Sequence, residues 1–230
     1  MKKSILTVAV LATMVGHGAH ATNNTNIVRP DKAFINGVET VAVVNGSKHT
    51  FGNDGVTAVF GSNETDYGLF AQSYVSPLEV NVLGKDISIT GKFRAVYATW
   101  WVNENDKVAV NIGNENTESI LLNQTGGLDS NGSSALTILD KGTTVNVTAK
   151  KIKIVSNGTY AVNSSGLDDT QDTKTVLTLK GESIEVQNPA PEAVGLAAYS
   201  GGTLNVEGNL VVSADHAIEA RGHSILNINK

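Results

Sequence analysis

Residues 144–165 read TVNVTAKKIKIVSNGTYAVNSS and contain three short runs in which apolar and polar residues alternate. The runs are Val145-Asn146-Val147, Ile152-Lys153-Ile154 and Ala161-Val162-Asn163-Ser164. Alternation with a period of two puts every second side chain on the same face of a β-strand, so each run predicts a short, half-buried strand. The second run starts 7 residues after the first, and the third starts 9 residues after the second. The stretch therefore predicts three strands joined by short turns.

The same three runs recur along the chain. The first run has Asn or Thr between two apolar residues, and it occurs at Val80–Val82, Val110–Ile112, Val145–Val147, Leu177–Leu179, Leu204–Val206 and Leu226–Ile228. The second run occurs at Ile87–Ile89, Ile152–Ile154, Ile184–Val186 and Leu210–Val212, and the third at Ala95–Ala98, Ala161–Ser164, Ala193–Leu196 and Ala217–Ala220. The offset from the first to the second run is 6 or 7 residues, and from the second to the third it is 7 to 9. The return to the next copy varies from 9 to 16 residues.

Two nearly fixed offsets and one variable return predict a solenoid in which one corner accepts insertions. A single turn buries about six side chains at ~2 kcal/mol each, which does not offset the ordering of about 22 residues at ~1–2 kcal/mol each. Neighbouring turns must therefore stack and fold together. The predicted fold is all-β, a right-handed parallel β-helix with three strands in each rung.

Two parts of the chain follow the repeat less well. In the first, between Ile112 and Thr144, Ser119–Leu122 is a candidate third strand and Leu136–Ile138 a candidate first strand, which leaves one rung without a clear second strand and the register of the segment open. The second comprises residues 22–77, which are predicted to be an irregular N-terminal cap, with strand-like runs at Val41–Val44, Val56–Phe60 and Leu69–Ala71. Residues 78–230 are predicted to be the β-helix repeats. Because Ile225–Ile228 starts another rung, we expect either that a further segment follows or that the reading frame is truncated.

The first 21 residues predict a signal peptide. Lys2 and Lys3 precede a mostly apolar stretch, and Ala19-His20-Ala21 fits the rule for cleavage between Ala21 and Thr22. The apolar stretch is too short to cross a bilayer of roughly 30 Å. Removing the signal leaves 15 basic and 22 acidic residues. This acidic excess disfavours nucleic acid as a partner, because phosphates require a basic surface.

A cleavable signal followed by rungs such as Leu204-Asn205-Val206-Glu207-Gly208-Asn209 resembles the passenger region of autotransporters, which are surface and adhesin proteins of Gram-negative bacteria. The resemblance covers residues 78–230. It implies export across the inner membrane and delivery to the cell surface or the extracellular space through an outer-membrane translocation barrel, which would belong to a longer chain. The absence of cysteine is compatible with such a passage, because a disulfide would obstruct the crossing of an unfolded chain.

Right-handed β-helices also include polysaccharide lyases and hydrolases, in which clustered acidic residues act as catalytic or calcium-binding groups. Asp168, Asp169 and Asp172 form the densest acidic group, in an insertion that we interpret as a solvated loop. Two further constellations suggest a catalytic triad but are interpreted as polar turn residues: Ser213 with Asp215-His216, and Arg221 with His223-Ser224. With no cysteine and only scattered histidines (His49 is the third after signal removal), no metal, cofactor or catalysis is expected.

One aromatic cluster, formed by Trp100, Trp101, Tyr97 and Phe93, is the candidate ligand contact. Exposed aromatic residues often anchor protein or sugar ligands. The alternative is that these rings simply cover the coil at a long corner. The leading hypothesis is a surface-displayed structural and adhesive module whose partner is a protein or a glycan of a host or bacterial surface. The alternatives are a polysaccharide-acting β-helix enzyme and an inactive, truncated passenger fragment.

Overall fold

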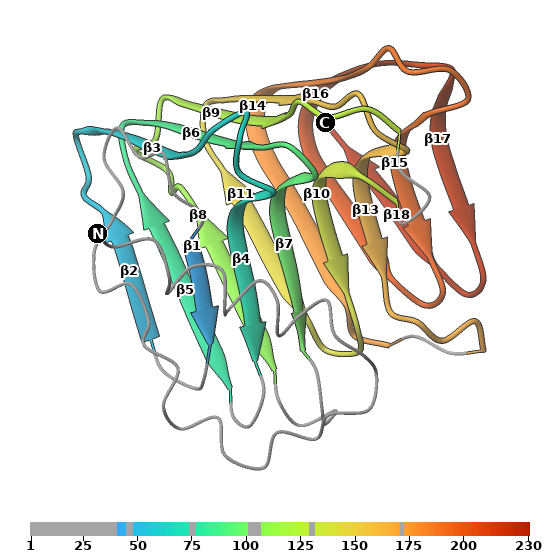
Figure 1. Ribbon diagram of the computed structural model, residues 1–230. Helices are drawn as coiled ribbons and strands as arrows, with labels where there is room; N and C mark the ends of the chain where they lie inside the picture. Colours follow the sequence, from blue (N-terminus) through green and yellow to red (C-terminus); the bar gives the residue numbers. More distant parts are fainter. Residues whose placement is uncertain (1–40, 45–47, 74–76, 101–106, 129–131, 171–172) are drawn as a thin grey trace.

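The computed structural model describes residues 41–44, 48–73, 77–100, 107–128, 132–170 and 173–230, which form strands and turns without a helix. All strand pairs are parallel, and Figure 1 shows successive turns of the chain following one another across the molecule, from blue at β2 to red at β17. The described part of the chain is therefore a parallel β-solenoid, as predicted. The predicted right hand stays a prediction, as do the signal peptide and its cleavage site, which lie outside the described residues.

The strands form three columns, which we call the first, second and third columns, and one strand or segment from each makes a rung. The first column holds β2 (Lys48–Gly52), β5 (Leu78–Leu83), β8 (Val108–Ile112), β11 (Thr144–Thr148), the starts of β14 (Val176–Asn188) and β16 (Thr203–Ala214), and β18 (Ile225–Asn229). The second holds β3 (Thr57–Gly61), β6 (Asp86–Gly91), β9 (Ser119–Gln124), β12 (Lys151–Val155) and the later parts of β14 and β16. The third holds β1 (Val41–Val44), β4 (Tyr67–Ser73), β7 (Arg94–Trp100), β10 (Ser134–Leu139), β13 (Tyr160–Ser165), β15 (Val194–Tyr199) and β17 (His216–Arg221).

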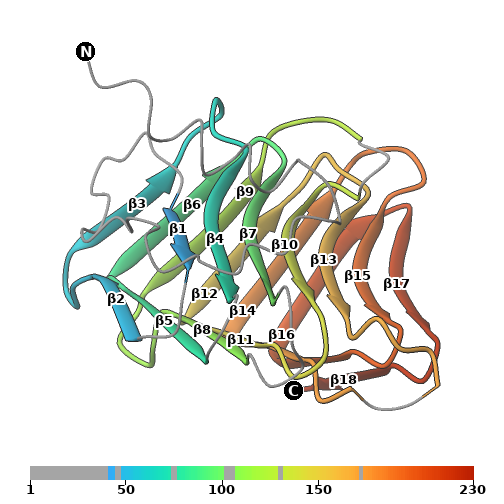
Figure 2. The same cartoon turned by 60° about the horizontal axis from the view of Figure 1, so that its bottom comes forward.

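The strand register follows the repeat read from the sequence. Val110 pairs with Val80 on one side and with Val145 on the other, so the Asn residues between the apolar positions lie above one another. Asn111 Nδ2 donates to Asn81 Oδ1 at 2.9 Å, and Asn146 Nδ2 donates to Asn111 Oδ1 at 2.9 Å. This amide ladder on the outer face is why Asn recurs in the first run. The third column forms a seven-stranded sheet, whereas β14 joins the first and second columns into one eleven-stranded sheet (Figure 2).

The sequence interpretation between Ile112 and Thr144 was wrong. Strand β9, which contains Ser119–Leu122, pairs with β6 and β12 and is a second strand rather than a third. Strand β10, which contains Leu136–Ile138, pairs with β7 and β13 and is a third strand rather than a first. The reason is an insertion at a corner that is tight elsewhere: Ile120 follows Val110 by 10 residues instead of 6 or 7. The repeated offset is lost there, although the stacking is kept.

Stacking also begins earlier than the sequence indicated. Strands β2, β3 and β4 pair in parallel with β5, β6 and β7 and form a rung within the segment 22–77 that was assigned to a cap. The strand-like runs at Val41–Val44, Val56–Phe60 and Leu69–Ala71 correspond to β1, β3 and β4. Solenoid pairing therefore starts before Leu78.

Side chains that point inward form one continuous apolar core, in which Val110, Ile154 and Leu196 are fully buried. Polar residues enter the interior at the corner between the second and third columns. There Gln124 Nε2 donates to the Lys92 carbonyl at 2.8 Å, Ser156 Oγ donates to Gln124 Oε1 at 3.0 Å, and Asn188 Nδ2 donates to the Gly158 carbonyl at 3.0 Å. These bonds give the buried polar side chains hydrogen-bond partners at the corner turns, including the Lys92 and Gly158 carbonyls. They fix the direction in which each third strand leaves its corner.

Candidate functional site

The outer face of the third column carries most of the described aromatic rings. In β4, β7, β13 and β15 two consecutive residues near the start of the strand, such as Ala95 and Val96 in β7, are both buried, so the in–out alternation shifts by one residue. Residues three apart, such as Arg94 and Tyr97, consequently point to the same outer side. The Arg94 guanidinium lies 4.2 Å from the centroid of the Tyr97 ring, which confirms that the two side chains share this face.

An aromatic cluster occupies the N-terminal part of this face. The rings of Phe70 and Tyr97 are stacked with centroids 5.2 Å apart, and Tyr67 lies 5.1 Å from Phe70 and 6.0 Å from Tyr97. Phe93 meets Tyr67 edge to face at 5.9 Å, and Arg94 lies 4.6 Å from the Phe93 ring. Burial is the main cause that raises the pKa of the Tyr97 hydroxyl, and the nearby Arg94 charge opposes it. The four rings are half-buried. They make stacking and edge-to-face contacts with one another and cation–π contacts with Arg94.

The structure brings Tyr97 and Phe93 together, as the sequence suggested, but it adds Tyr67 and Phe70 from the preceding rung. Their spacing in the sequence, three residues apart as for Arg94 and Tyr97, is the signal that would have placed them on one face. Trp100 ends strand β7, but its side chain is outside the described residues, and so is Trp101. The contact role of the two tryptophans stays a prediction.

A second group lies farther along the same face, on β13, β15 and β17. The rings of Tyr160 and Tyr199 meet edge to face with centroids 5.6 Å apart. The Tyr199 hydroxyl donates to Glu219 Oε2 at 2.5 Å, and the Glu219 carboxylate is ion-paired with Arg221. Burial is the main cause that raises the pKa of Tyr199, and its bond to the Glu219 carboxylate adds to the rise. At physiological pH Tyr199 is therefore a neutral hydrogen-bond donor.

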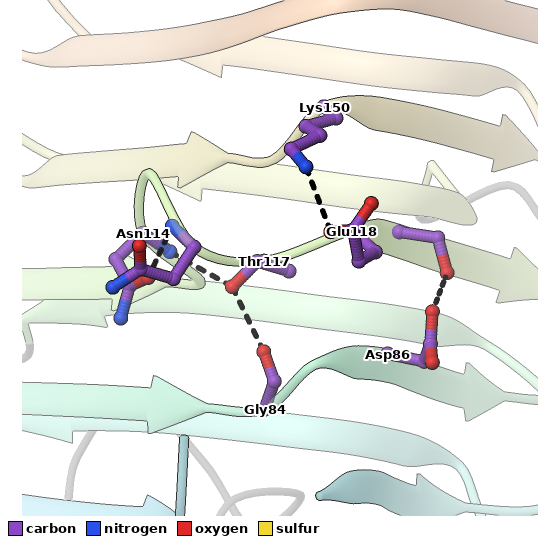
Figure 3. A network of polar contacts seen from close by, with 8 residues as sticks. Gly84, Asp86, Asn114, Thr117, Glu118 and Lys150 are labelled. Atoms are coloured by element: carbon purple, nitrogen blue, oxygen red, sulfur yellow. Dashed lines mark hydrogen bonds and ion pairs between the residues drawn. The ribbon is translucent and has the colours of Figure 1, made fainter. Parts of the chain in front are cut away.

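The corner between the first and second columns forms a charged ladder, shown in close-up in Figure 3. Thr117 Oγ1 donates to the Gly84 carbonyl at 2.9 Å and accepts from the backbone amide nitrogen of Asn114 at 3.1 Å. One hydroxyl therefore links two neighbouring rungs. Lys150 Nζ lies 2.7 Å from Glu118 Oε1 in the neighbouring rung (Figure 3). The bond to Glu118 raises the pKa of Lys150 above its ordinary value.

The ladder continues toward the C-terminal end as an open groove of about 350 Å³. Lys180 Nζ lies 2.8 Å from Glu115 Oε1, which raises the pKa of Lys180. Acidic and basic side chains alternate along the groove, and its lining includes Lys150, Lys180, Glu182, Glu207, Gly208 and Lys230. Alternating charge favours stacking of each rung in one register, because a slip would place like charges together. The groove has the features of a structural seam.

In the acidic insertion, the Asp168 carboxylate is bonded within the loop itself. Asp168 Oδ1 accepts hydrogen bonds from the amide and the hydroxyl of Thr170, at 2.9 and 2.6 Å. The carbonyl of Asp169 contacts His223 Nδ1 at 3.0 Å, which ties the loop to the last rungs. Asp172 lies outside the described residues. Within the described part of the chain, no group of three or more His, Cys, Asp or Glu side chains is placed to hold a metal ion.

In the two suggested triads, the Asp215 and Arg221 side chains have partners outside the triad. Asp215 Oδ2 accepts from the Glu192 backbone amide at 2.9 Å, and Arg221 pairs with Glu219 rather than with His223 or Ser224. His216 belongs to the edge strand β17, where its backbone amide donates to the Ala193 carbonyl at 3.0 Å. His49 in β2 stacks on Phe51 with centroids 6.3 Å apart. These contacts are those of turn and strand residues.

Among the described residues, no helix is long and apolar enough to cross a membrane. Comparison with protein-family models, with curated proteins and with solved structures finds no match to this chain. Its function therefore has to be inferred from its own residues.

Proposed function

We propose that this chain is an exported, surface-displayed structural and adhesive module that resembles an autotransporter passenger with a right-handed coil. The observation that carries the proposal is the outer face of the third column. Aromatic and polar side chains are displayed there from β4 to β17, on a scaffold whose core is packed throughout its middle rungs. A stacked solenoid holds such a face rigidly, so a long ligand meets many side chains that are already in place.

The contacts on this face differ from those of an enzyme pocket. The aromatic cluster around Tyr97 and the group around Tyr199 lie at separate positions along the solenoid, on β7 and β15. A partner that reaches both has to be extended along the axis, as a glycan chain or a surface protein is. In this proposal Tyr97, Trp100 and Trp101 form the main contact, and an outer-membrane translocation barrel in a longer polypeptide delivers the module to the surface.

Adhesion of particles that carry the purified chain tests the proposal. Beads coated with the wild-type protein should bind host or bacterial cells, and the double variant Trp100→Ala/Trp101→Ala should bind several-fold fewer cells. The matched control is Lys153→Ala on the second column, which removes an exposed side chain paired with Glu185 at 3.3 Å and should leave adhesion unchanged. Unchanged adhesion of the double variant would remove the tryptophans from the contact surface.

Two other results would change the assignment itself. Turnover of polyuronate or another glycan by the purified protein would favour the polysaccharide-acting enzyme. Absence of binding to every cell type by well-folded wild-type protein would favour an inactive fragment.

A further inference from the structure

Three turns lie next to one another at the corner where the third column returns to the first. They follow β13, β15 and β17, because β15 pairs with β13 on one side and with β17 on the other. The backbone bonds of the sheet continue into this corner. The Ser200 amide donates to the Arg221 carbonyl at 3.1 Å, and the Gly201 amide donates to the Gly222 carbonyl at 2.7 Å. The turns after β15 and β17 are therefore bonded to each other through the backbone.

The turn after β17 leads into β18, and both strands lie at the edge of the described solenoid. Among the described strands, β17 pairs only with β15, and β18 pairs only with β16. Their inward residues Ile218 and Ile228 are each 46% exposed. A segment with few buried apolar contacts and one open edge is prone to local opening. A contact that reaches this turn from farther down the solenoid therefore adds to the stability of the two strands.

A short part of the acidic insertion makes such a contact. The Asp168 amide donates to the Ser200 carbonyl at 3.0 Å, which attaches the insertion to the turn after β15. The Asp168 carboxylate accepts from both the amide and the hydroxyl of Thr170, which makes the loop compact. Asp169 extends past the turn after β15, and its carbonyl accepts from His223 Nδ1 at 3.0 Å in the turn after β17. The insertion follows β13, so it contacts both of the later turns.

The backbone conformation of His223 shows that its side chain contributes more than a turn requires. Its φ of +52° lies in the left-handed region, where glycine is favoured over residues with a Cβ. A carbonyl oxygen only accepts, so the Nδ1 atom that contacts Asp169 carries the hydrogen. A Cβ on the neighbouring Gly222 would overlap the Asp169 carboxylate, so the insertion lies directly against this turn. His223 thus occupies a strained position and makes a bond that glycine could not make there.

From these contacts we propose that residues 168–170 form a strap that spans three rungs and holds the last described strands, β17 and β18, in place. Asp168 attaches the strap to the turn after β15, and His223 fastens it to the turn after β17. When the bond between Asp169 and His223 is broken, β17 and β18 detach more often, while the middle rungs stay packed. The inference goes beyond the proposed function, because it concerns how one end of the solenoid opens and depends on no ligand.

Hydrogen–deuterium exchange of the purified chain, followed by mass spectrometry, tests the strap. The informative variant is His223→Gly, which removes the ring and also relieves the positive φ. A residue that serves only the turn would then be replaced at no cost, and exchange in β17 and β18 would be unchanged or slower. The strap predicts exchange about fivefold faster in these two strands, as the loss of one hydrogen bond implies. Exchange in β11 and β12 should stay as in the wild type.

Two further changes separate the strap from the flexibility of glycine. Ser200→Gly relieves a φ of +49° in the turn after β15 and keeps the backbone carbonyl that binds Asp168. It is the matched control and should not speed the exchange of β17 and β18. Asp168→Ala removes the acceptor for Thr170 and should speed their exchange, whereas Asp168→Asn keeps an acceptor oxygen and should exchange as the wild type does.

Three results would overturn the strap. The first is exchange in β17 and β18 of His223→Gly that is no faster than in the wild type. The second is equally fast exchange in Ser200→Gly, which would assign the effect to glycine itself. The third is faster exchange throughout His223→Gly, including β11 and β12, which would show a loss of global stability rather than local opening. Equal exchange in Asp168→Ala and Asp168→Asn would contradict the strap as well.

Discussion

Inward-pointing residues of the same type are buried in the middle rungs but not in the last one. Leu177 and Leu179 of β14 are fully buried, whereas Ile228 of β18, two rungs along the column from Leu179, is 46% exposed and Leu226 is half-buried. In the third column, Leu196 is fully buried and its register partner Ile218 is 46% exposed. An inward position is therefore not sufficient for burial in a solenoid. At this end of the described solenoid, β17 and β18 pair with another strand on one side only, and their inward residues are the ones that stay in contact with water.

The largest expected effect comes from truncating one leucine in each region. Leu177→Ala should lower the free energy of unfolding by about 2–5 kcal/mol, because it leaves a cavity between two packed rungs. Leu226→Ala, in the same column, should cost only about 1 kcal/mol, because the side chain is already partly in water. Denaturant unfolding followed by circular dichroism measures both. Equal losses would contradict the idea that a second neighbouring rung decides burial.

Two corner glycines, one in a middle rung and one in the last rung, allow the same comparison for the turns. Gly113 has a φ of +72°, and a Cβ there would lie 2.3 Å from the Thr148 backbone carbonyl oxygen. Gly222 has a φ of +62°, but its Cβ would meet the Asp169 side chain at 2.3 Å, which is free to move. Gly113→Ala should therefore cost about 2–3 kcal/mol and Gly222→Ala about 1 kcal/mol. Thermal unfolding of the two variants checks the order, and the reverse order would show that the last corner is as constrained as the middle one.

The smallest effect concerns the ion pair between rungs. The bond to Glu118 raises the pKa of Lys150 above 10.5, so the folded state favours the charged form. Its contribution is fully present below pH 10.5 and is lost as the pH rises through the folded pKa. Lys150→Met should lower the melting temperature by less than about 2 °C at pH 7.

The same variant sharpens the comparison at high pH. As the pH rises through the raised pKa of the folded-state lysine, the difference between wild type and Lys150→Met should shrink and then disappear, since the wild-type lysine is then deprotonated as well. Melting curves between pH 8 and 12 measure this convergence. A difference that stays constant across the range would assign the effect of Lys150 to packing of its aliphatic stem.

The sequence predicted the fold where the offsets were regular. Val80, Val110 and Val145 were expected to lie in one column, and they pair in parallel as predicted. The prediction was wrong at Ser119–Leu122, because an insertion precedes a strand whose alternation alone does not say which column it joins. Alternation fixes which side chains point inward, whereas the partner of a strand depends on the path of the chain around the corner.

The candidate site was predictable only in part. Tyr97 and Phe93 were identified because they are close in the sequence, and the structure places them together with Arg94. Tyr160 and Tyr199 were not identified, because 38 residues separate them and each looks like an isolated aromatic residue in the sequence. Their rings meet because β13 and β15 are neighbouring strands, although Tyr160 begins β13 and Tyr199 ends β15.

The sequence by itself determined that this chain forms short strands with one apolar face, repeated often enough that they must stack. The reason is local: alternation within three or four residues sets the face of each strand, and fixed offsets set the size of the coil. Only the tertiary structure decided which strands share a column, which inward residues are covered on both sides, and which outer side chains meet. These properties depend on neighbours about a rung away in the chain, and insertions at the corners change that distance without changing the local pattern.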